Sequence, residues 1–127
     1  MELPLYDPRK SERIQIALPL TYVIQCGTSP LEGRTSTIDV GGGGVRFVVP
    51  RMVSPQTMCR LTLTLPDRTE PLLFTARASW CRQISIGGHD QFELGAGFVI
   101  SDAADDAAAF GHYCQFIAGR ILLKHVG

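Results

Sequence analysis

Apolar and polar side chains alternate along the residues that follow Arg13. From Ile14 to Ile24 every second residue is apolar or aromatic, and the intervening positions carry glutamine, alanine, proline, threonine and valine. A period of two over this length predicts one long, half-buried β-strand. Pro19 has no N–H to donate to a neighbouring strand, so we expect a sheet edge or a bulge at that position.

Five further segments carry strand patterns and are separated by turn signals rich in glycine, proline and aspartate. They span residues 33–38, 45–49, 58–65, 72–82 and 92–100. In the fifth of the six strands, the alternation places Trp80 on the same side as Phe74, Ala76 and Ala78. Residues 87–90, Gly-Gly-His-Asp, predict the hairpin that joins the last two strands.

The apolar period changes from two to about 3.6 near residue 101. Ser101 or Asp102 is suited to cap a helix, and two aspartates follow in the first turn, where their charge favours the helix dipole. Apolar residues then recur at helical spacing, at Phe110, Tyr113, Cys114, Ile117 and Ile121. The predicted helix runs from about Ala103 to Gly119 or beyond. Gly111 and Gly119 lower the helix propensity, so we expect the helix to depend on docking against the rest of the protein.

Six short strands followed by one helix predict a mainly β protein, a six-stranded antiparallel barrel with a C-terminal α-helix. A closed barrel would also remove exposed sheet edges from a small protein. The expected organisation is an N-terminal arm over residues 1–13, a barrel over 14–101, and the helix and tail over 102–127. The 127 residues suit one domain with a real core.

The overall composition excludes several classes of function. The formal net charge is zero, so a general attraction to a nucleic acid polymer or to anionic lipid is not indicated. No apolar segment approaches the length of a membrane span, and the N-terminus lacks the basic region followed by an apolar region that marks a secretory signal. Four scattered cysteines form no Cys-x-x-Cys pair, and the histidines lie at no zinc-like spacing to them. We therefore expect a reduced, cytoplasmic protein without a metal.

No catalytic constellation stands out in the sequence. Serines and cysteines are present, but nothing pairs a nucleophile with a base. The glycine run at 41–44 lacks the lysine and the helix of a phosphate-binding loop. We predict that the protein is not an enzyme and needs no cofactor, and keep a small enzyme with a cysteine nucleophile as a remote alternative.

Residues 37–47 read Thr-Ile-Asp-Val-Gly-Gly-Gly-Gly-Val-Arg-Phe, so four glycines interrupt two strand-like runs. Glycine has no Cβ, and it therefore adopts positive φ or lets another molecule approach the backbone closely. Asp39 stands two residues before the run and Arg46 two residues after it. These features suggest a backbone shelf with an acceptor and a donor at its ends. The alternative is a mobile hairpin turn.

The N-terminal arm carries Arg9-Lys10-Ser11-Glu12-Arg13 directly before the first predicted strand. Arginine presents a planar fork that matches the O6/N7 edge of guanine and also stacks on bases. An aspartate accepts hydrogen bonds from the N–H donors of the guanine Watson–Crick edge. Two arginines, one aspartate and exposed glycine backbone together favour a small anionic guanine nucleotide, although a solvated charged tail would also explain the arm.

At these residues the chain resembles the PilZ domain family. That family carries Arg-x-x-x-Arg before its first barrel strand, matched by Arg9 and Arg13, and Asp/Asn-x-Ser-x-x-Gly after its second, matched from Asp39 to Gly44. The segment from Ala76 to Arg82 is similar to the family's fifth-strand pattern. Leu94-Gly95-Ala96-Gly97-Phe98, followed by an acidic helix start, extends the resemblance over about residues 9–119.

The resemblance implies a barrel that binds cyclic di-GMP, a bacterial second messenger, and acts as a ligand-switched adaptor in motility, pili or exopolysaccharide regulation. Arg9 and Arg13 would wrap the ligand, Asp39 would hold a guanine edge, and Gly44 would keep the turn open. Lys10 and Arg46 are secondary ligand-binding candidates. Binding would order the arm and so change the surface offered to a downstream protein partner.

The chain departs from the family pattern at Gly41, which stands at the motif serine. One neutral hydrogen bond contributes about 0.5–1.5 kcal/mol, so affinity would fall several-fold without being abolished. The alternative function is therefore a protein-interaction module of the same fold that no longer binds cyclic di-GMP. The apolar segment 116–123 is either a helix face docked onto the barrel or a partner or homodimer surface.

Overall fold

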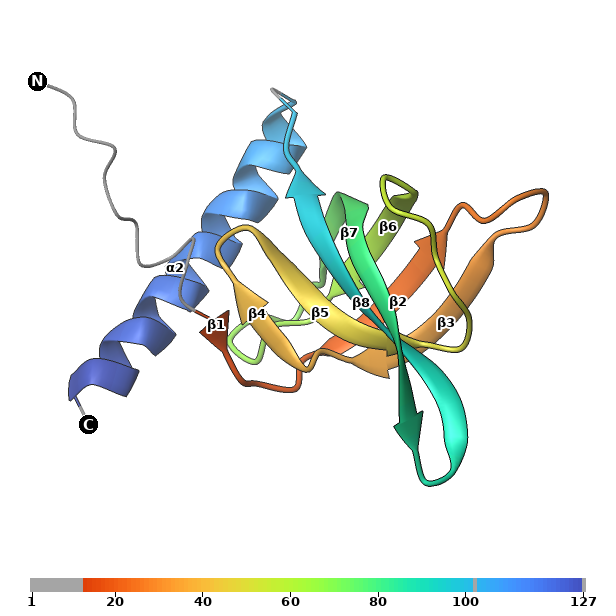
Figure 1. The fold of residues 1–127 in the computed structure, drawn as a ribbon. Helices are drawn as coiled ribbons and strands as arrows, with labels where there is room; N and C mark the ends of the chain where they lie inside the picture. Colours follow the sequence, from red (N-terminus) through yellow and green to blue (C-terminus); the bar gives the residue numbers. More distant parts are fainter. Residues whose placement is uncertain (1–12, 102, 127) are drawn as a thin grey trace, which may run out of the picture.

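The computed structural model describes residues 13–101 and 103–126, which form one sheet and one long helix (Figure 1). Arg9 and Lys10 lie outside these described residues. The strands are β1 (Arg13–Ile14), β2 (Pro19–Ile24), β3 (Leu31–Ser36), β4 (Asp39–Gly41), β5 (Gly44–Val49), β6 (Met58–Leu63), β7 (Leu72–Ile86) and β8 (His89–Val99), followed by the helix α2 (Ala104–Val126).

All the strands belong to one antiparallel sheet in the order β1-β4-β5-β8-β7-β6-β2-β3. The mainly β fold with a C-terminal helix is confirmed. The closed six-stranded barrel is wrong, because the described residues form eight strands in an open sheet whose end strands are β1 and β3. The expected first strand is broken into β1 and β2, and the expected second strand is followed by the separate short strand β4.

The extra strands arise because residues 13–24 and 31–41 form one long bent hairpin. Its inner half pairs β2 with β3, and its outer half pairs β1 with β4. Between the pairs Ile14–Val40 and Pro19–Ser36, residues 15–18 oppose residues 37–39, so one extra residue bulges at the bend. The two halves consequently lie at opposite ends of the strand order.

Thr37, which is only 3% exposed, holds the bend together. Its hydroxyl accepts a hydrogen bond from the Leu18 N–H at 2.9 Å and donates one to the Ile16 carbonyl at 2.7 Å. The Thr37 N–H donates to the Leu18 carbonyl at 3.0 Å. A side chain thus replaces the ladder bonds that a continuous strand would make. Pro19 begins β2 directly after the bend, as expected for a residue without an N–H.

The hairpin of β7 and β8 is longer than predicted and projects from the body of the sheet (Figure 1). Gly87 and Gly88 form its tip with φ of 57° and 82°, conformations that glycine reaches without strain. The register shifts between Ala78 and Trp80, where the chain forms a bulge. The bulge moves Trp80 to the outer face beside Gly95, so the prediction that it faces the core with Ala78 is wrong.

The helix α2 begins one residue later than predicted and continues past Gly119. The Ser101 hydroxyl accepts from the Ala103 N–H at 3.1 Å and donates to Asp106 Oδ2 at 2.6 Å, so Ser101 ties the segment before the helix to its first turn. Tyr113 anchors the helix, because its ring packs edge-on against Phe98 with centroids 5.0 Å apart.

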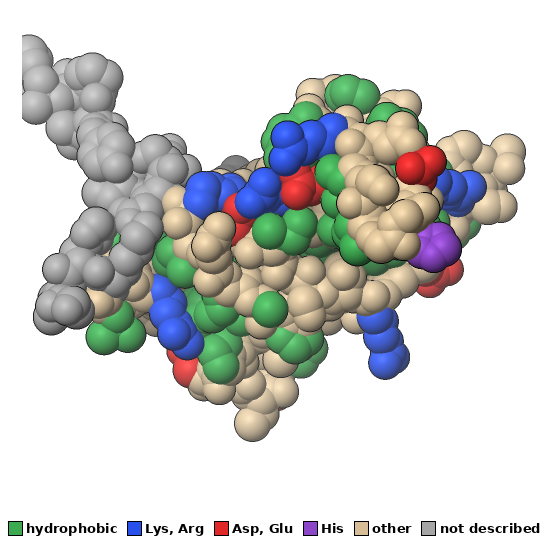
Figure 2. All heavy atoms as spheres, turned by 60° about the horizontal axis from the view of Figure 1, so that its bottom comes forward, with side chains coloured by type: hydrophobic (Ala, Val, Ile, Leu, Met, Phe, Trp, Pro, Cys, Tyr) green, Lys and Arg blue, Asp and Glu red, His purple; other side chains and the backbone are tan. Residues whose placement is uncertain are grey.

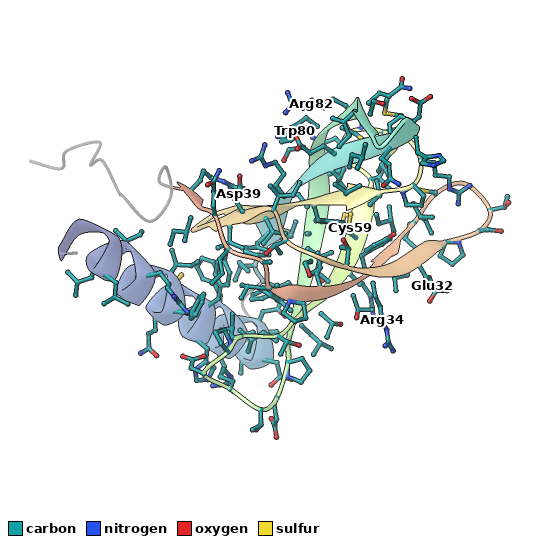
Figure 3. All side chains as sticks on the ribbon, turned by 90° about the horizontal axis from the view of Figure 1, so that it is seen from below. Glu32, Arg34, Asp39, Cys59, Trp80 and Arg82 are labelled. Atoms are coloured by element: carbon teal, nitrogen blue, oxygen red, sulfur yellow. The ribbon has the colours of Figure 1, made fainter. Side chains whose placement is uncertain are left out.

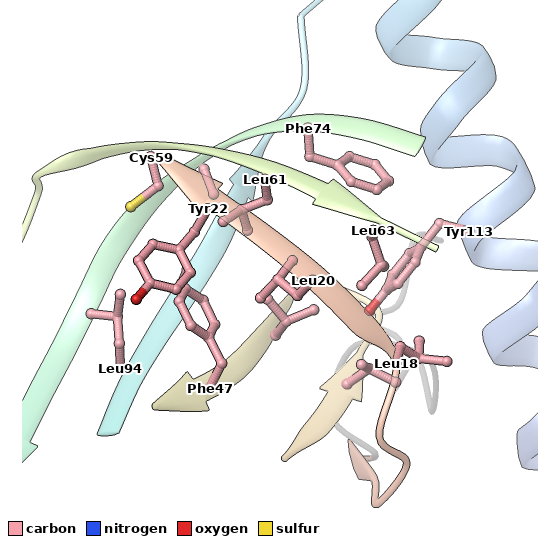
Figure 4. Close-up of a cluster of buried hydrophobic side chains, with 14 of the residues drawn as sticks. Leu18, Leu20, Tyr22, Phe47, Cys59, Leu61, Leu63, Phe74, Leu94 and Tyr113 are labelled. Carbon is pink, nitrogen blue, oxygen red and sulfur yellow. The ribbon is translucent and has the colours of Figure 1, made fainter. Parts of the chain in front are cut away.

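The core lies on the concave side of the curved sheet and under α2 (Figure 4). Its strand residues are the ones that the sequence alternation predicts to face inward, since alternate residues of β2, β5, β6 and β7 are buried. Its largest fully buried side chains are Tyr113, Phe47, Ile24, Leu61, Leu63, Leu65, Leu94 and Ile117. The opposite, convex positions of β1, β4, β5, β8 and β7 are therefore left to form an outer surface.

Candidate functional site

Five of the predicted site residues converge on the outer face of the sheet. Register pairs place Arg13 opposite Gly41, Gly41 opposite Gly44, and Asp39 opposite Arg46. Residues separated by up to 33 positions in the chain are thereby brought to one end of the sheet, where β1, β4 and β5 lie side by side. The predicted Arg9 and Lys10 lie outside the described residues.

Asp39 is the centre of this group and is buried, with its side chain 6% exposed. Arg13 Nε donates to Asp39 Oδ1 at 3.0 Å, and Arg46 Nη2 donates to Asp39 Oδ2. Each carboxylate oxygen therefore has its own guanidinium partner. A buried carboxylate is stable only with such pairing, so Asp39 requires at least one of these arginines, or a ligand that replaces it.

The pairing continues across the sheet through two residues that the sequence did not indicate. Arg46 Nη1 lies 3.3 Å from Glu93 Oε1, and Arg82 Nη2 lies 2.8 Å from the same oxygen. We call Arg13, Asp39, Arg46, Glu93 and Arg82 the charged row, which follows the strand order β1-β4-β5-β8-β7. Figure 2 shows blue and red side chains side by side on this surface. Three cations and two carboxylates leave the row with one positive charge in excess.

Glycines form the floor next to the charged row. Gly44 on β5 lies opposite Gly97 on β8, and a Cβ on Gly44 would lie 2.0 Å from the Ala96 carbonyl oxygen. Among the glycines that the structure describes, positive φ angles occur at Gly27, Gly87 and Gly88, and not in the run of four. Gly44 is therefore required by close packing against the chain's own Ala96 backbone, and approach of another molecule to this run stays a prediction.

Trp80 forms a wall above this floor. Its ring lies over Gly95, where a Cβ would come within 2.4 Å of the indole Nε1, and the Arg82 guanidinium lies 5.8 Å from its ring centroid. The tryptophan is 40% exposed. Asp39, Trp80 and Arg82 point to the same side of the sheet, whereas Arg34 lies on another side (Figure 3). A glycine inside a strand pattern often marks a close approach, so Gly95 is the sequence signal for this contact.

A hollow of about 510 Å³ lies between the charged row, the glycine floor and Trp80. We call it the glycine-side hollow; its lining residues are Arg13, Asp39, Gly43, Gly44, Val45, Arg46, Ser79, Trp80, Gly95, Ala96 and Gly97. Its volume falls within the range of about 300–1,000 Å³ that small-molecule sites occupy. A flat floor, an aromatic wall, guanidinium donors and one carboxylate acceptor suit a planar, hydrogen-bonding, anionic ligand.

The turn that carries the glycines is held from below by α2. The buried Tyr113 hydroxyl donates to the Gly41 carbonyl and lies 3.3 Å from the Gly44 carbonyl, so it contacts both ends of the turn. Burial raises the pKa of the Tyr113 hydroxyl far above its ordinary value. It therefore remains a protonated donor at physiological pH, which fixes the turn to the core.

Other chemistry is scarce in the part of the chain that the structure describes. No three histidine, cysteine, aspartate or glutamate side chains there are grouped to hold a metal ion. No helix within residues 103–126 is long and apolar enough to cross a membrane. The four cysteines are unbridged, and burial with a neighbouring Cys26 raises the pKa of the Cys59 thiol to about 11.

Comparison with known families gives a match to the PilZ domain over residues 7–116. Among solved structures, the chain is similar to the Bacillus subtilis inhibitor of motility MotI/DgrA, with 20% identity and a TM-score of 0.59 over 88% of this chain and 50% of that one. The PilZ domain of CeSA from a cellulose-synthesizing bacterium shares 20% identity, with a TM-score of 0.51 over 78% of this chain and 91% of that one.

The Borreliella burgdorferi PlzA protein, solved in complex with c-di-GMP, shares 10% identity, with a TM-score of 0.53 over 88% of this chain. The chain spans 50% of MotI/DgrA and 53% of PlzA, so it corresponds to about half the length of each. A comparison with curated proteins found no match. At these identities the solved structures show a shared fold.

Proposed function

The chain belongs to the PilZ domain family, whose members are ligand-binding regulatory domains, and on that premise we propose that it binds cyclic di-GMP and acts as a ligand-switched regulator. The observation that carries the proposal is the meeting of Arg13, Asp39 and Arg46 over a glycine floor. The match covers residues 7–116 and therefore includes the two motif segments.

In the proposed complex, Asp39 accepts the N1–H and N2–H donors of a guanine edge. It then gives up at least one arginine partner, because its two oxygens are already occupied by Arg13 and Arg46. The released guanidinium forms a charge-assisted fork to guanine or to phosphate. Arg9 and Lys10, which the sequence predicts as ligand contacts, would add further contacts to the ligand.

Trp80 supplies the stacking surface in this proposal. A base lying on the glycine floor meets the indole face at the edge of the hollow, and stacking of a base on an aromatic side chain contributes about 1–3 kcal/mol. Because Trp80 is the only tryptophan of the chain, its fluorescence reports ligand binding directly.

The test is a titration of the purified protein with cyclic di-GMP, followed by calorimetry and by Trp80 fluorescence. We expect Asp39→Asn and Arg13→Ala to weaken binding by about 10- to 150-fold each, since each removes charge-assisted hydrogen bonds of about 1.5–3 kcal/mol. Arg34→Ala, which changes an exposed arginine on β3, is the matched control and should bind as wild type. Absence of heat and of a fluorescence change at high micromolar ligand would refute the proposal.

Gly41 in place of the motif serine favours a second candidate, a PilZ-fold module that works through protein contacts alone. Leu122 and Leu123 near the end of α2 are each 65% exposed and would supply a partner or homodimer surface. A protein that binds no ligand but forms a defined complex, lost on Leu122→Ser with Leu123→Ser, would support this candidate over the receptor.

A further inference from the structure

A second hollow adjoins the first on the opposite side of the Arg13–Asp39 pair. It has a volume of about 610 Å³ and lies between β1 and the C-terminal half of α2. We call it the helix-side hollow; it is lined by Arg13, Ile14, Gln15, Asp39, Arg120 and Leu123. Figure 1 shows β1 beside this half of the helix. Because Arg13 and Asp39 line both hollows, a molecule bound at that pair can extend into either one.

Arg120 is the cation that distinguishes this hollow. It is half-buried, and its guanidinium lies 5.2 Å from the centroid of the Phe116 ring. Among the described residues, no carboxylate forms an ion pair with Arg120, whereas Arg13, Arg46 and Arg82 each form at least one. The aromatic contact positions the guanidinium without neutralising it.

The charge balance of the helix-side hollow therefore favours an anion. It contains the two guanidinium groups of Arg13 and Arg120, and its one carboxylate, Asp39, is already shared with Arg46. Gln15 adds an exposed amide, while Ile14 and Leu123 add apolar surface. Arginine pairs of this kind hold phosphate oxygens through parallel N–H donors.

We propose that the helix-side hollow is the second half of the ligand site and that Arg120 holds a phosphate group of the bound cyclic dinucleotide. This inference rests on the proposed function. The ligand lies across the Arg13–Asp39 pair, with one nucleotide half over the glycine floor and the other half against α2. The helix then contacts the ligand directly through Arg120, in addition to holding the glycine turn through Tyr113.

The test compares Arg120→Gln with wild type in calorimetric titrations with cyclic di-GMP at two salt concentrations. We expect the variant to bind at least tenfold more weakly and with a smaller salt dependence, since one cation–phosphate contact is lost. Arg120→Lys should keep the salt dependence and lose part of the affinity, because lysine retains the charge but not the fork. Arg34→Gln, an exposed arginine on β3, should change neither quantity.

The outcomes separate this inference from the function on which it rests. A wild-type protein that binds no cyclic di-GMP refutes both. A wild type that binds, together with an Arg120→Gln variant of unchanged affinity and salt dependence, overturns the role of Arg120 and leaves the receptor function standing. Equal thermal unfolding of the three variants shows that each is folded, and Arg120→Lys carries the test if Arg120→Gln does not fold.

Discussion

One buried hydroxyl ties the glycine turn to α2, and removing that hydroxyl tests how much it contributes to holding the site. In Tyr113→Phe the ring and its contacts with Phe74 and Phe98 stay, but the Gly41 carbonyl loses its buried donor. A buried acceptor left without a partner costs about 1–3 kcal/mol. With an unfolding entropy of about 2.1 cal/mol/K per residue, a loss of about 2 kcal/mol lowers the Tm of this 127-residue chain by roughly 7 °C.

Tyr22 provides the matched control for this prediction. It is 5% exposed and its ring packs against Phe47, but within the described residues its hydroxyl makes no hydrogen bond to protein. Tyr22→Phe should therefore change the free energy of unfolding by less than about 0.5 kcal/mol. Urea unfolding of the two variants measures the difference. Equal losses, or no loss in Tyr113→Phe, would show that the hydroxyl does not hold the turn.

Three further predictions concern the floor of the site and the core. Gly41→Ser restores the motif hydroxyl and should raise cyclic di-GMP affinity by about 2- to 12-fold, as one neutral hydrogen bond allows; unchanged affinity in calorimetry would argue against a ligand contact there. In Gly95→Ala the new methyl group forces the exposed Trp80 ring to move, so we expect a shift of Trp80 fluorescence with little change in the free energy of unfolding. In Gly44→Ala the methyl group clashes with the Ala96 backbone, so we expect a loss of about 1–3 kcal/mol in the free energy of unfolding measured in urea. A larger loss in Gly95→Ala than in Gly44→Ala would contradict the close packing at Gly44. The raised pKa of Cys59 contributes stability that is complete below pH 9 and is lost as pH rises through about 11, because only the unfolded thiol ionises in that window. Cys59→Ala should therefore reduce the decline of the free energy of unfolding between pH 9 and about 11. An unchanged decline in the variant would exclude the thiol as its source.

The sequence predicted the strands well where local pattern determines them, and it grouped three residues that the structure brings together. The alternation from Met58 onward marks β6, and the change of period near Ser101 marks the start of α2. Arg13, Asp39 and Arg46 were assigned to one site, and the structure brings them into contact. The strand predictions succeed because alternation depends on few long-range interactions, whereas the ligand-binding role of the three residues stays a prediction.

The missed features all depend on contacts between distant segments. The bend in the first hairpin requires the Thr37 side chain to reach Ile16 and Leu18. The bulge that turns Trp80 outward cannot be recognised from the apolar alternation, because it is one extra residue in a long strand. Glu93 occupies an outward position that alternation predicts to be solvated, yet it is 7% exposed because two arginines cover it.

The bent hairpin also divides the molecule into regions of unequal cooperativity. Its outer half contains two register pairs between β1 and β4, whereas its inner half contains six between β2 and β3. We therefore expect the outer half to separate from β5 while the inner half stays paired with β6, and amide protons near Asp39 to exchange through such sub-global openings. A ligand that bridges Arg13 and Asp39 closes that opening, and slowed exchange confined to one end of the sheet would be its signature.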